Sequence, residues 1–384
     1  MHCRQDVERG LAMKTKFLGV AVSLAVFGSI SAAPCSVNAA TYTPIDLGTL
    51  PGAPASLAYG INNRGQVVGY SYVNNIATAA VWNGTTPTAL GMAPGGISSA
   101  AQGINNRGQV VGGTEFRNLP NSLFVATVWN GTTPTTLGYL PGTNYSTGEA
   151  INASGQVAGY SNSNNVTTSN IATVWNGATP TALGMLPGGT WSIAAGINNQ
   201  GKVAGYTTVN GGAVATVWNG TTPTALGMLP GATSSFGQGI NNSGKVVGLS
   251  VIDNLAIATV WDGTTPTALA MLPGGVASFA YDINNSGELV GDTRFLDGTI
   301  EATLWDGGVA IALGMLAGDS NSLALAINDA GQIAGWSFGP GQAHATLWVD
   351  PVLQTPLPAA LPLFASGLAG LGLLGWRRKK TAAV

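Results

Sequence analysis

The sequence predicts an all-β fold, a seven-bladed β-propeller of four-stranded blades whose ring is closed by the N-terminal strand. Three observations predict it: a motif that recurs seven times, a tryptophan after every copy, and complementary half-repeats at the two ends of the repeat region. This region spans residues 41–350. A linear β-repeat array is the alternative, but such an array does not need matched half-repeats at its ends.

The repeat is defined by the motif Ile-Asn-x-x-Gly-x-φ-x-Gly, in which φ is aliphatic. Successive copies begin 43 to 47 residues apart, a period typical of propellers and solenoids. The motif begins at Ile61, Ile104, Ile151, Ile197, Ile240, Ile283 and Ile327, and the tryptophans that follow are Trp82, Trp129, Trp175, Trp218, Trp261, Trp305 and Trp348.

The fifth copy shows how one repeat divides into strands. We expect strands at 233–240, 245–250, 256–261 and 266–272, separated by turns that contain Asn and Gly. Asn-Gly or Asp-Gly between β-rich runs predicts a hairpin, because both central residues need a positive φ. Four short strands in one repeat are the pattern of a propeller blade.

Ring closure follows from the two ends of the repeat region. Trp348 is followed by Val349-Asp350 instead of a hairpin turn and a fourth strand. At the other end, residues 44–48 match the fourth strand at 87–91, but no tryptophan precedes them. The N-terminal segment can therefore supply the strand that the last blade lacks, which protects the edge of that blade.

Sequence length varies at one place in the repeat. The first six of these tryptophans each lie 22 residues before the next motif, and in every motif the last Gly lies 8 positions after the Ile. The distance from that Gly to the tryptophan varies from 13 to 17 residues. We therefore expect the loops between the second and third strands to form a variable binding face.

The N-terminal 40 residues are predicted to be a secretory signal peptide. Met13 is the expected true start, because a short basic stretch and an apolar run to Ala33 follow it, and Ala39 or Ala40 ends a cleavage site. An uncleaved membrane anchor is the alternative. Both cysteines, Cys3 and Cys35, lie in this leader, so the mature chain has no thiol for disulfides or metal sites.

Residues 351–384 combine a proline-containing motif, an apolar stretch to Trp376 long enough to span a membrane, and a basic tail. This order resembles the PEP-CTERM sorting signals that an exosortase processes, in a Pro-Leu-Pro-Ala variant. An ordinary tail anchor is the alternative interpretation. The residues that carry the signal are Thr355, Pro356, Leu357, Pro358, Arg377, Arg378, Lys379 and Lys380.

Residues 41–350 resemble the HAF family of probable extracellular repeats. The resemblance lies in Ile-Asn-Asn-Arg-Gly-Gln-Val-Val-Gly at 61–69 and 104–112, in the strand before each tryptophan, and in Leu-Gly-x-Leu-Pro-Gly. The His-Ala-Phe triplet of that family survives only in part, as His344-Ala345-Thr346. The resemblance implies an extracellular location and a repeat architecture, and no particular activity.

Composition and residue types argue against catalysis and nucleic-acid binding. Residues 41–350 contain 6 Lys and Arg against 14 Asp and Glu, a net charge of 6 − 14 = −8, which gives no basic footprint for nucleic acid. His344 has no cysteine partner, and the Ile-Asn turns carry too few carboxylates for calcium. We therefore predict no enzyme and no catalytic, cofactor or metal site. A hydrolase that uses Asp292, Asp297 or Glu301 is the alternative.

The predicted function is that of a non-catalytic surface or biofilm-matrix protein of a Gram-negative-type bacterium. Signal peptidase and exosortase would be its partners during export, with transient membrane contact through the C-terminal segment, and no cofactor is expected. Its loop face would bind an extracellular polysaccharide or a surface protein. The tryptophans are expected to pack between blades, with sugar stacking as the alternative. The residues expected at the ligand face are Tyr72, Phe116, Arg117, Tyr160, Tyr206 and Trp336.

The sorting-signal hypothesis predicts that the mature protein lacks its C-terminal residues. An exosortase would cut near residues 356–358 while the basic residues hold the segment in the inner membrane. Intact-mass analysis of the surface fraction from the native host should therefore show a chain without Arg377 to Val384. A permanent tail anchor predicts an intact C-terminus that only detergent extracts, and that result would contradict the hypothesis.

Overall fold

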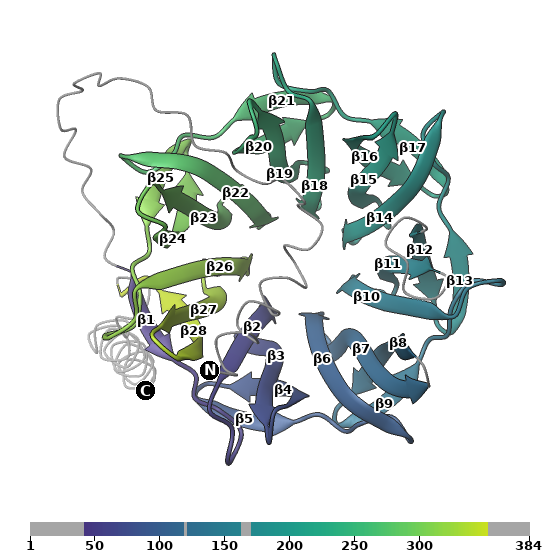
Figure 1. Cartoon of the computed structure of the whole chain (residues 1–384), viewed down its shortest axis with the longest axis vertical. Helices are drawn as coiled ribbons and strands as arrows, with labels where there is room; N and C mark the ends of the chain where they lie inside the picture. The colour runs from purple at the N-terminus through teal and green to yellow at the C-terminus, as the bar shows by residue number, and fades with distance from the viewer. Residues whose placement is uncertain (1–41, 119–120, 163–169, 352–384) are drawn as a thin grey trace, which may run out of the picture.

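The computed structural model describes residues 42–118, 121–162 and 170–351. These residues form 28 strands in seven four-stranded antiparallel sheets, arranged as blades of a ring (Figure 1). The predicted seven-bladed propeller is confirmed, and the linear array is not adopted. Within these ranges no helix is long and apolar enough to cross a membrane. The leader and the sorting signal predicted at 1–40 and 351–384 lie outside the described residues, except for Pro351.

The blades follow one another in chain order, with the first strand of each blade innermost. Blade 1 contains β2 (Ser56–Ile61), β3 (Gln66–Val73), β4 (Ile76–Asn83) and β5 (Thr86–Ala89). Blade 2 contains β6 (Gly96–Ile104), β7 (Gln109–Asn118), β8 (Asn121–Asn130) and β9 (Thr133–Thr136). Blade 3 contains β10 (Tyr145–Ile151), β11 (Val157–Asn162), β12 (Ile171–Asn176) and β13 (Thr179–Ala182). Blades 4 and 5 contain β14 (Gly189–Ile197), β15 (Val203–Val209), β16 (Gly212–Asn219), β17 (Thr222–Ala225); β18 (Ser234–Ile240), β19 (Val246–Ile252), β20 (Leu255–Asp262) and β21 (Thr265–Ala268). Blades 6 and 7 contain β22 (Gly275–Ile283), β23 (Leu289–Phe295), β24 (Ile300–Asp306), β25 (Val309–Ala312); β26 (Asn321–Ile327), β27 (Ile333–Gly339), β28 (Gln342–Val349) and the N-terminal β1 (Thr43–Asp46).

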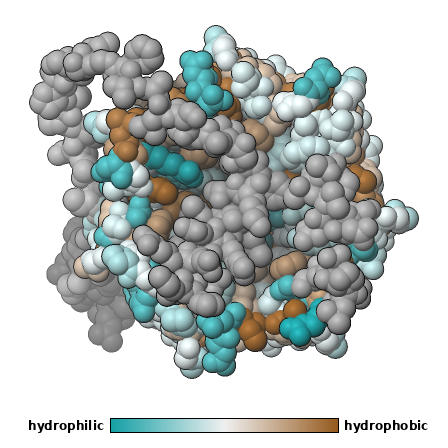
Figure 2. Space-filling view, viewed as in Figure 1, coloured by the Kyte–Doolittle hydropathy of each residue, from teal (hydrophilic) through white to brown (hydrophobic). Residues whose placement is uncertain are grey.

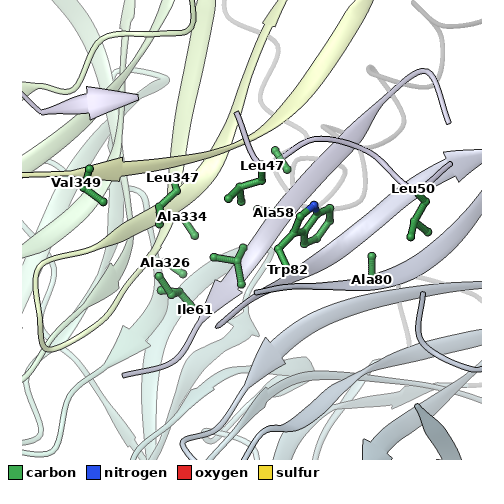
Figure 3. Packing of buried hydrophobic residues seen from close by; sticks show 12 residues of the cluster. Leu47, Leu50, Ala58, Ile61, Ala80, Trp82, Ala326, Ala334, Leu347 and Val349 are labelled. Atoms are coloured by element: carbon green, nitrogen blue, oxygen red, sulfur yellow. The ribbon is translucent and has the colours of Figure 1, made fainter. Parts of the chain in front are cut away.

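The N-terminal strand closes the ring as the sequence predicts. β1 pairs antiparallel with β28, with Pro44 opposite Trp348, and the Leu47 N–H donates to the Ala345 carbonyl at 2.9 Å. Figure 3 shows the apolar cluster at this junction, where Leu47 lies between Leu347 of blade 7 and Trp82 of blade 1. The first residues of the ring and its last strand therefore share one blade and one core.

The Ile-Asn motif forms the turn after each inner strand, and its asparagine links adjacent blades. In blade 4, the Asn198 Oδ1 accepts the backbone N–H groups of Gln200 and Lys202, both at 3.0 Å, while Gly201 adopts a φ of +78°. The Asn198 Nδ2 donates to the Asn241 carbonyl of blade 5 at 3.0 Å. Seven such bonds of 3.0–3.2 Å form a closed ring through Asn62, Asn105, Asn152, Asn198, Asn241, Asn284 and Asn328.

The last glycine of the motif is required because two strands approach closely there. A Cβ on Gly205 would lie 1.9 Å from the Ile193 carbonyl oxygen of the inner strand. In all seven blades the corresponding distance is 1.8–2.0 Å, so no side chain fits. The inner strand carries a β-bulge opposite this region in every blade, for example between Ala194 and Gly196.

A second ring of hydrogen bonds, which the sequence analysis did not identify, joins the blades at buried serines. In each case a backbone N–H of the third strand donates to a serine Oγ in the inner strand of the next blade, at 2.9–3.1 Å. The bond from the Ala345 N–H to Ser56 completes the circle. The serines are Ser56, Ser99, Ser146, Ser192, Ser235, Ser278 and Ser322.

The repeated tryptophans are buried, which supports their predicted role in packing. Trp218 is 0% exposed and packs with Val203 of its own blade and Ala158 of the preceding blade. Its Nε1 donates to the Gly184 carbonyl at 2.6 Å, and such a bond forms for six of the seven repeated tryptophans, Trp218 included. In blade 5 the fourth strand ends at Ala268, not at residue 272 as predicted, since the Ala270 carbonyl accepts the indole N–H of Trp305 and no longer follows the sheet.

Replacing one of these tryptophans should strongly destabilise the ring. Trp218→Ala removes a fully buried indole and its hydrogen bond, so we expect the free energy of unfolding to fall by about 3–5 kcal/mol. Chemical denaturation measures this change. A loss below about 1 kcal/mol would contradict the packing role, because that is far less than a buried aromatic contributes.

Candidate functional site

The antiparallel blades give the ring two different faces. The turns of the Asn ring and the hairpins after the tryptophans lie on one face, here called the Asn face. The loops between the second and third strands and the connections between blades lie on the other, here called the loop face. In the view of Figure 2, hydrophobic and hydrophilic residues alternate in small patches around the ring. The two faces therefore differ in repetition: one is built by the constant motif, the other by the variable segments.

The variable segments differ in more than loop length. Blade 1 uses a tight turn in which Asn74 and Asn75 have φ values of 51° and 63°, the geometry of a type I′ hairpin. In blade 2 the extra residues extend the hairpin instead of the loop, because β7 and β8 are 10 residues long. Blade 6 has a wider loop that leaves Leu296 69% exposed. The prediction that all length variation is in the loop is therefore corrected for blade 2.

The six residues predicted for the ligand face all lie on second strands, towards the loop face, but only three are accessible. Arg117 is exposed, and Tyr72 and Phe116 are half-buried. The other three face neighbouring blades and are buried, with exposed fractions of 6%, 2% and 2%: Tyr160, Tyr206 and Trp336. Burial makes these three packing residues, so we do not retain them as ligand contacts.

The buried rings form an aromatic belt beneath the loop face. Tyr206 shows the arrangement, since its ring contacts Trp191 at 5.5 Å and Phe236 of the next blade at 4.8 Å between centroids. Similar contacts occur elsewhere around the ring. The belt comprises Tyr59, Tyr70, Tyr145, Tyr160, Trp191, Tyr206, Phe236, Phe279, Tyr281, Trp336 and Phe338.

Blade 6 places a buried ion pair among the rings of the belt. Asp292 is fully buried at the position that Tyr206 and Leu249 occupy in blades 4 and 5. Its carboxylate accepts the Tyr281 hydroxyl at 2.8 Å and the Arg294 Nε at 3.0 Å. The guanidinium of Arg294 lies 4.0 Å from the centre of the Phe279 ring, a cation–π contact. Comparison of the repeats position by position could have identified this exception.

Burial shifts the protonation equilibria of this cluster. It raises the pKa of the Asp292 carboxyl above its usual value, although Arg294 and the hydrogen bond from Tyr281 oppose the shift. Burial, followed by the charge of Asp292, raises the pKa of Tyr281 well above 10.0. For Arg294, burial lowers the pKa, but the Asp292 carboxylate outweighs this effect and keeps the guanidinium charged. The three groups stabilise one another and the ion pair is internal to the blade.

The carboxylates considered for a hydrolase do not meet. Thr293 lies opposite Glu301 in the register, so Asp292 and Glu301 project from opposite faces of the blade. Asp297 is exposed in the loop, and hydrogen bonds from Thr299 lower its pKa. Across the described ranges, no group of three or more His, Cys, Asp or Glu side chains is arranged to hold a metal ion.

His344 lies in β28 and pairs with an acid. Its Nδ1 is 3.2 Å from the Asp319 Oδ2, and its Nε2 is 3.4 Å from the Gln342 Oε1. Asp319 is only 6% exposed, so this contact joins the start of blade 7 to its third strand. The geometry supports a structural role for His344.

A narrow channel runs through the centre of the ring. The bulge in each inner strand turns one residue towards the axis, and these residues differ from blade to blade. The cavity has a volume of about 160 Å³, below the 300–1,000 Å³ that is usual for ligand pockets. A second cavity of about 230 Å³ lies at the Asn ring. The bulge residues are Tyr59, Gln102, Glu149, Ala195, Gln238, Tyr281 and Leu325.

The fold is similar to propellers in solved structures. A puromycin-hydrolysing peptidase of Mycobacterium tuberculosis gives a TM-score of 0.50 at 12% identity, over 85% of this chain and 57% of that chain. A puromycin hydrolase gives 0.50 at 12%, over 84% and 56%. The propeller domain of the trilobed protease from Pyrococcus furiosus gives 0.49 at 8%, over 77% and 94%.

These neighbours include enzymes, but likeness at such identities shows the fold alone. The chain spans little more than half the length of the first two proteins. No protein-family model and no curated protein matches the chain.

The ion pair of blade 6 predicts a larger loss of stability for a single than for a double substitution. Arg294→Val alone leaves the buried Asp292 carboxylate without its partner, so the free energy of unfolding should fall by about 3–5 kcal/mol. Asp292→Leu with Arg294→Val installs the residues of blade 5, Leu249 and Val251, and leaves only the neutral Tyr281 hydroxyl without its acceptor, so the loss should be at most about 1–3 kcal/mol. Denaturation of both variants tests this, and a double variant as unstable as the single one would contradict it.

Proposed function

We propose that the protein is a non-catalytic binding protein, exported to the cell surface or extracellular matrix, that presents its loop face to a polysaccharide or a surface protein. The observation that carries this proposal is the contrast between the two faces. The Asn face repeats one hydrogen-bonded turn in all seven blades, whereas hairpin length differs from blade to blade on the loop face. Length variation that lies on one face of a repeat protein is typical of a binding surface.

The accessible residues of blade 2 are the best candidates for ligand contact. The hairpin of β7 and β8 is longer than that of the other blades, and the exposed Arg117 and half-buried Phe116 lie near its end. A guanidinium beside an aromatic ring suits a sugar, since the ring can stack and the guanidinium can donate to hydroxyl or carboxylate oxygens. Tyr72 of the adjacent blade 1 offers a second half-buried ring on the same face.

The alternative of a secreted hydrolase receives less support. Asp292 is held by Arg294 and Tyr281, and Glu301 projects from the other face of the blade. A general acid and base must both reach the scissile bond, and these carboxylates do not converge on one site. The enzymes among the structural neighbours share the fold only, so they do not favour catalysis for this chain.

Export through signal peptidase, with later processing by an exosortase, is part of the proposal. It is supported by the leader and the C-terminal signal in the sequence. The C-terminal segment would contact the inner membrane during export, and the ring would then be released to the surface.

A pair of matched variants tests the binding face. Arg117→Ser and Arg107→Ser remove the same exposed charge from blade 2, one near the loop face and one on the Asn face. We expect wild type and Arg107→Ser to bind the purified exopolysaccharide of the host equally, and Arg117→Ser to bind about tenfold or more weakly, as the loss of a charged hydrogen bond predicts. The measurement is a binding isotherm on the immobilised polysaccharide, extended to a glycan array.

Two results would contradict this proposal. Equal weakening by both substitutions would show that the loop face is not the contact surface. Release of new reducing ends from the polysaccharide would show that the protein is a hydrolase.

A further inference from the structure

The outer strands of the seven blades differ at one position. In six blades the outer strand has a proline directly opposite the buried tryptophan of the third strand. In blade 6 the residue opposite Trp305 is Ala310. The six prolines are Pro44, Pro87, Pro134, Pro180, Pro223 and Pro266.

The register shows what each proline does. In blade 6 the Leu313 N–H donates to the Ala302 carbonyl of β24. Backbone groups alternate in direction along a strand, so those of Ile311 and Val309 also point towards β24. The backbone groups of Ala310 and Ala312 therefore point away from the sheet. In the other blades, proline at the position of Ala310 has no N–H to present, and proline is a common protection of sheet edges.

The side chains of β25 also differ from those of the other outer strands, and this difference too favours strand addition. Five of them read Thr-Pro-Thr followed by Ala or Thr, with exposed threonines, whereas β25 reads Val-Ala-Ile-Ala. Val309 is 46% exposed. β25 is the terminal strand of its sheet, at the outside of the ring (Figure 1). One edge of the described ring is thus apolar and uncharged, and the backbone N–H of Ala310 at its centre can donate a hydrogen bond to another strand. These features permit strand addition.

We propose that the outer edge of blade 6 is a dimer interface, in which β25 pairs antiparallel with β25 of a second copy of this chain. A two-fold axis at Ile311 would place Ala310 of one copy opposite Ala312 of the other, so that the Ala310 N–H of each copy donates to the Ala312 carbonyl of its partner. The four residues carry no charge that would repel, and the two Asp306 carboxylates lie at opposite ends of the paired strands. Proline removes the outward N–H from the other six outer strands, so the described ring of each chain has one such edge and assembly stops at two copies.

The experiment is sedimentation velocity of the exported protein across a dilution series. We expect wild type to dissociate from dimer to monomer on dilution, and Ala310→Pro to raise the dissociation constant by about tenfold to hundredfold, because two backbone bonds are lost. Proline occupies the equivalent place in six blades, but Ala270 stands where three blades have a glycine that packs against this proline, so the melting temperature is measured to separate loss of folding from loss of pairing. Val309→Lys places a charge on the same edge, leaves the backbone intact and should give the same loss.

A converse variant gives the matched control. Thr222→Val, Pro223→Ala and Thr224→Ile together turn β17 of blade 4 into the Val-Ala-Ile-Ala of β25. A chain with two open edges should assemble beyond the dimer. A wild type that is monomeric at every concentration, a dimer that Ala310→Pro and Val309→Lys leave intact, or a converse variant that does not grow past the wild-type size would each overturn the proposal.

Discussion

Each blade depends on its neighbour for hydrogen bonds that its own strands cannot provide. The asparagine of each turn donates to the next blade, and each third strand donates to a serine of the next inner strand. In a linear array the last blade would leave a buried amide and a buried N–H without partners, each at a cost of about 1–3 kcal/mol. Here Asn328 bonds to Asn62 and Ala345 to Ser56, across 266 and 289 residues of sequence. Closure of the ring is the condition that satisfies these groups, and the N-terminal β1 and Leu47 seal the same junction with apolar contacts.

The fold was predictable because its constraints repeat. The motif contains an asparagine that bonds within and between blades, a glycine with positive φ, and a glycine that no side chain can replace, so all seven copies retain it. The serine ring could not be predicted, because serine is also common in exposed strands. Only the hydrogen bond from the neighbouring blade distinguishes these buried serines from exposed ones. Among the site residues, Tyr160, Tyr206 and Trp336 were misplaced because an aromatic residue in a strand gives no sign of whether it faces a loop or a neighbouring blade.

Repetition also determines where the ring can vary. A bulge residue such as Glu149 or Gln238 turns into the channel, where it makes no repeated contact, so its chemistry is free to differ. The loops between second and third strands have the same freedom, since their ends are held by β-pairs. The variable positions therefore gather along the axis and on the loop face. A ligand can be recognised there without disturbing the bonds that close the ring, which is why a constant scaffold and a variable surface occur together.

Blade 6 departs from the repeat at three separate places. Asp282 occupies a position that is glycine in four blades. At one of these glycines, Gly239, a Cβ would lie 2.9 Å from a carbonyl oxygen of the next blade. The Asp282 carboxylate accepts the N–H groups of Ile283 and Ile327 and so spans the junction with blade 7. Asp292 places a buried charge within the aromatic belt, and Ala310 replaces the edge proline. None of these changes is needed for closure, because six other blades close without them. Buried charge and an open edge both carry a cost in stability or solubility. The three changes lie at the channel, within the aromatic belt and at the outer edge, and the proposed dimer contact would use the last of them.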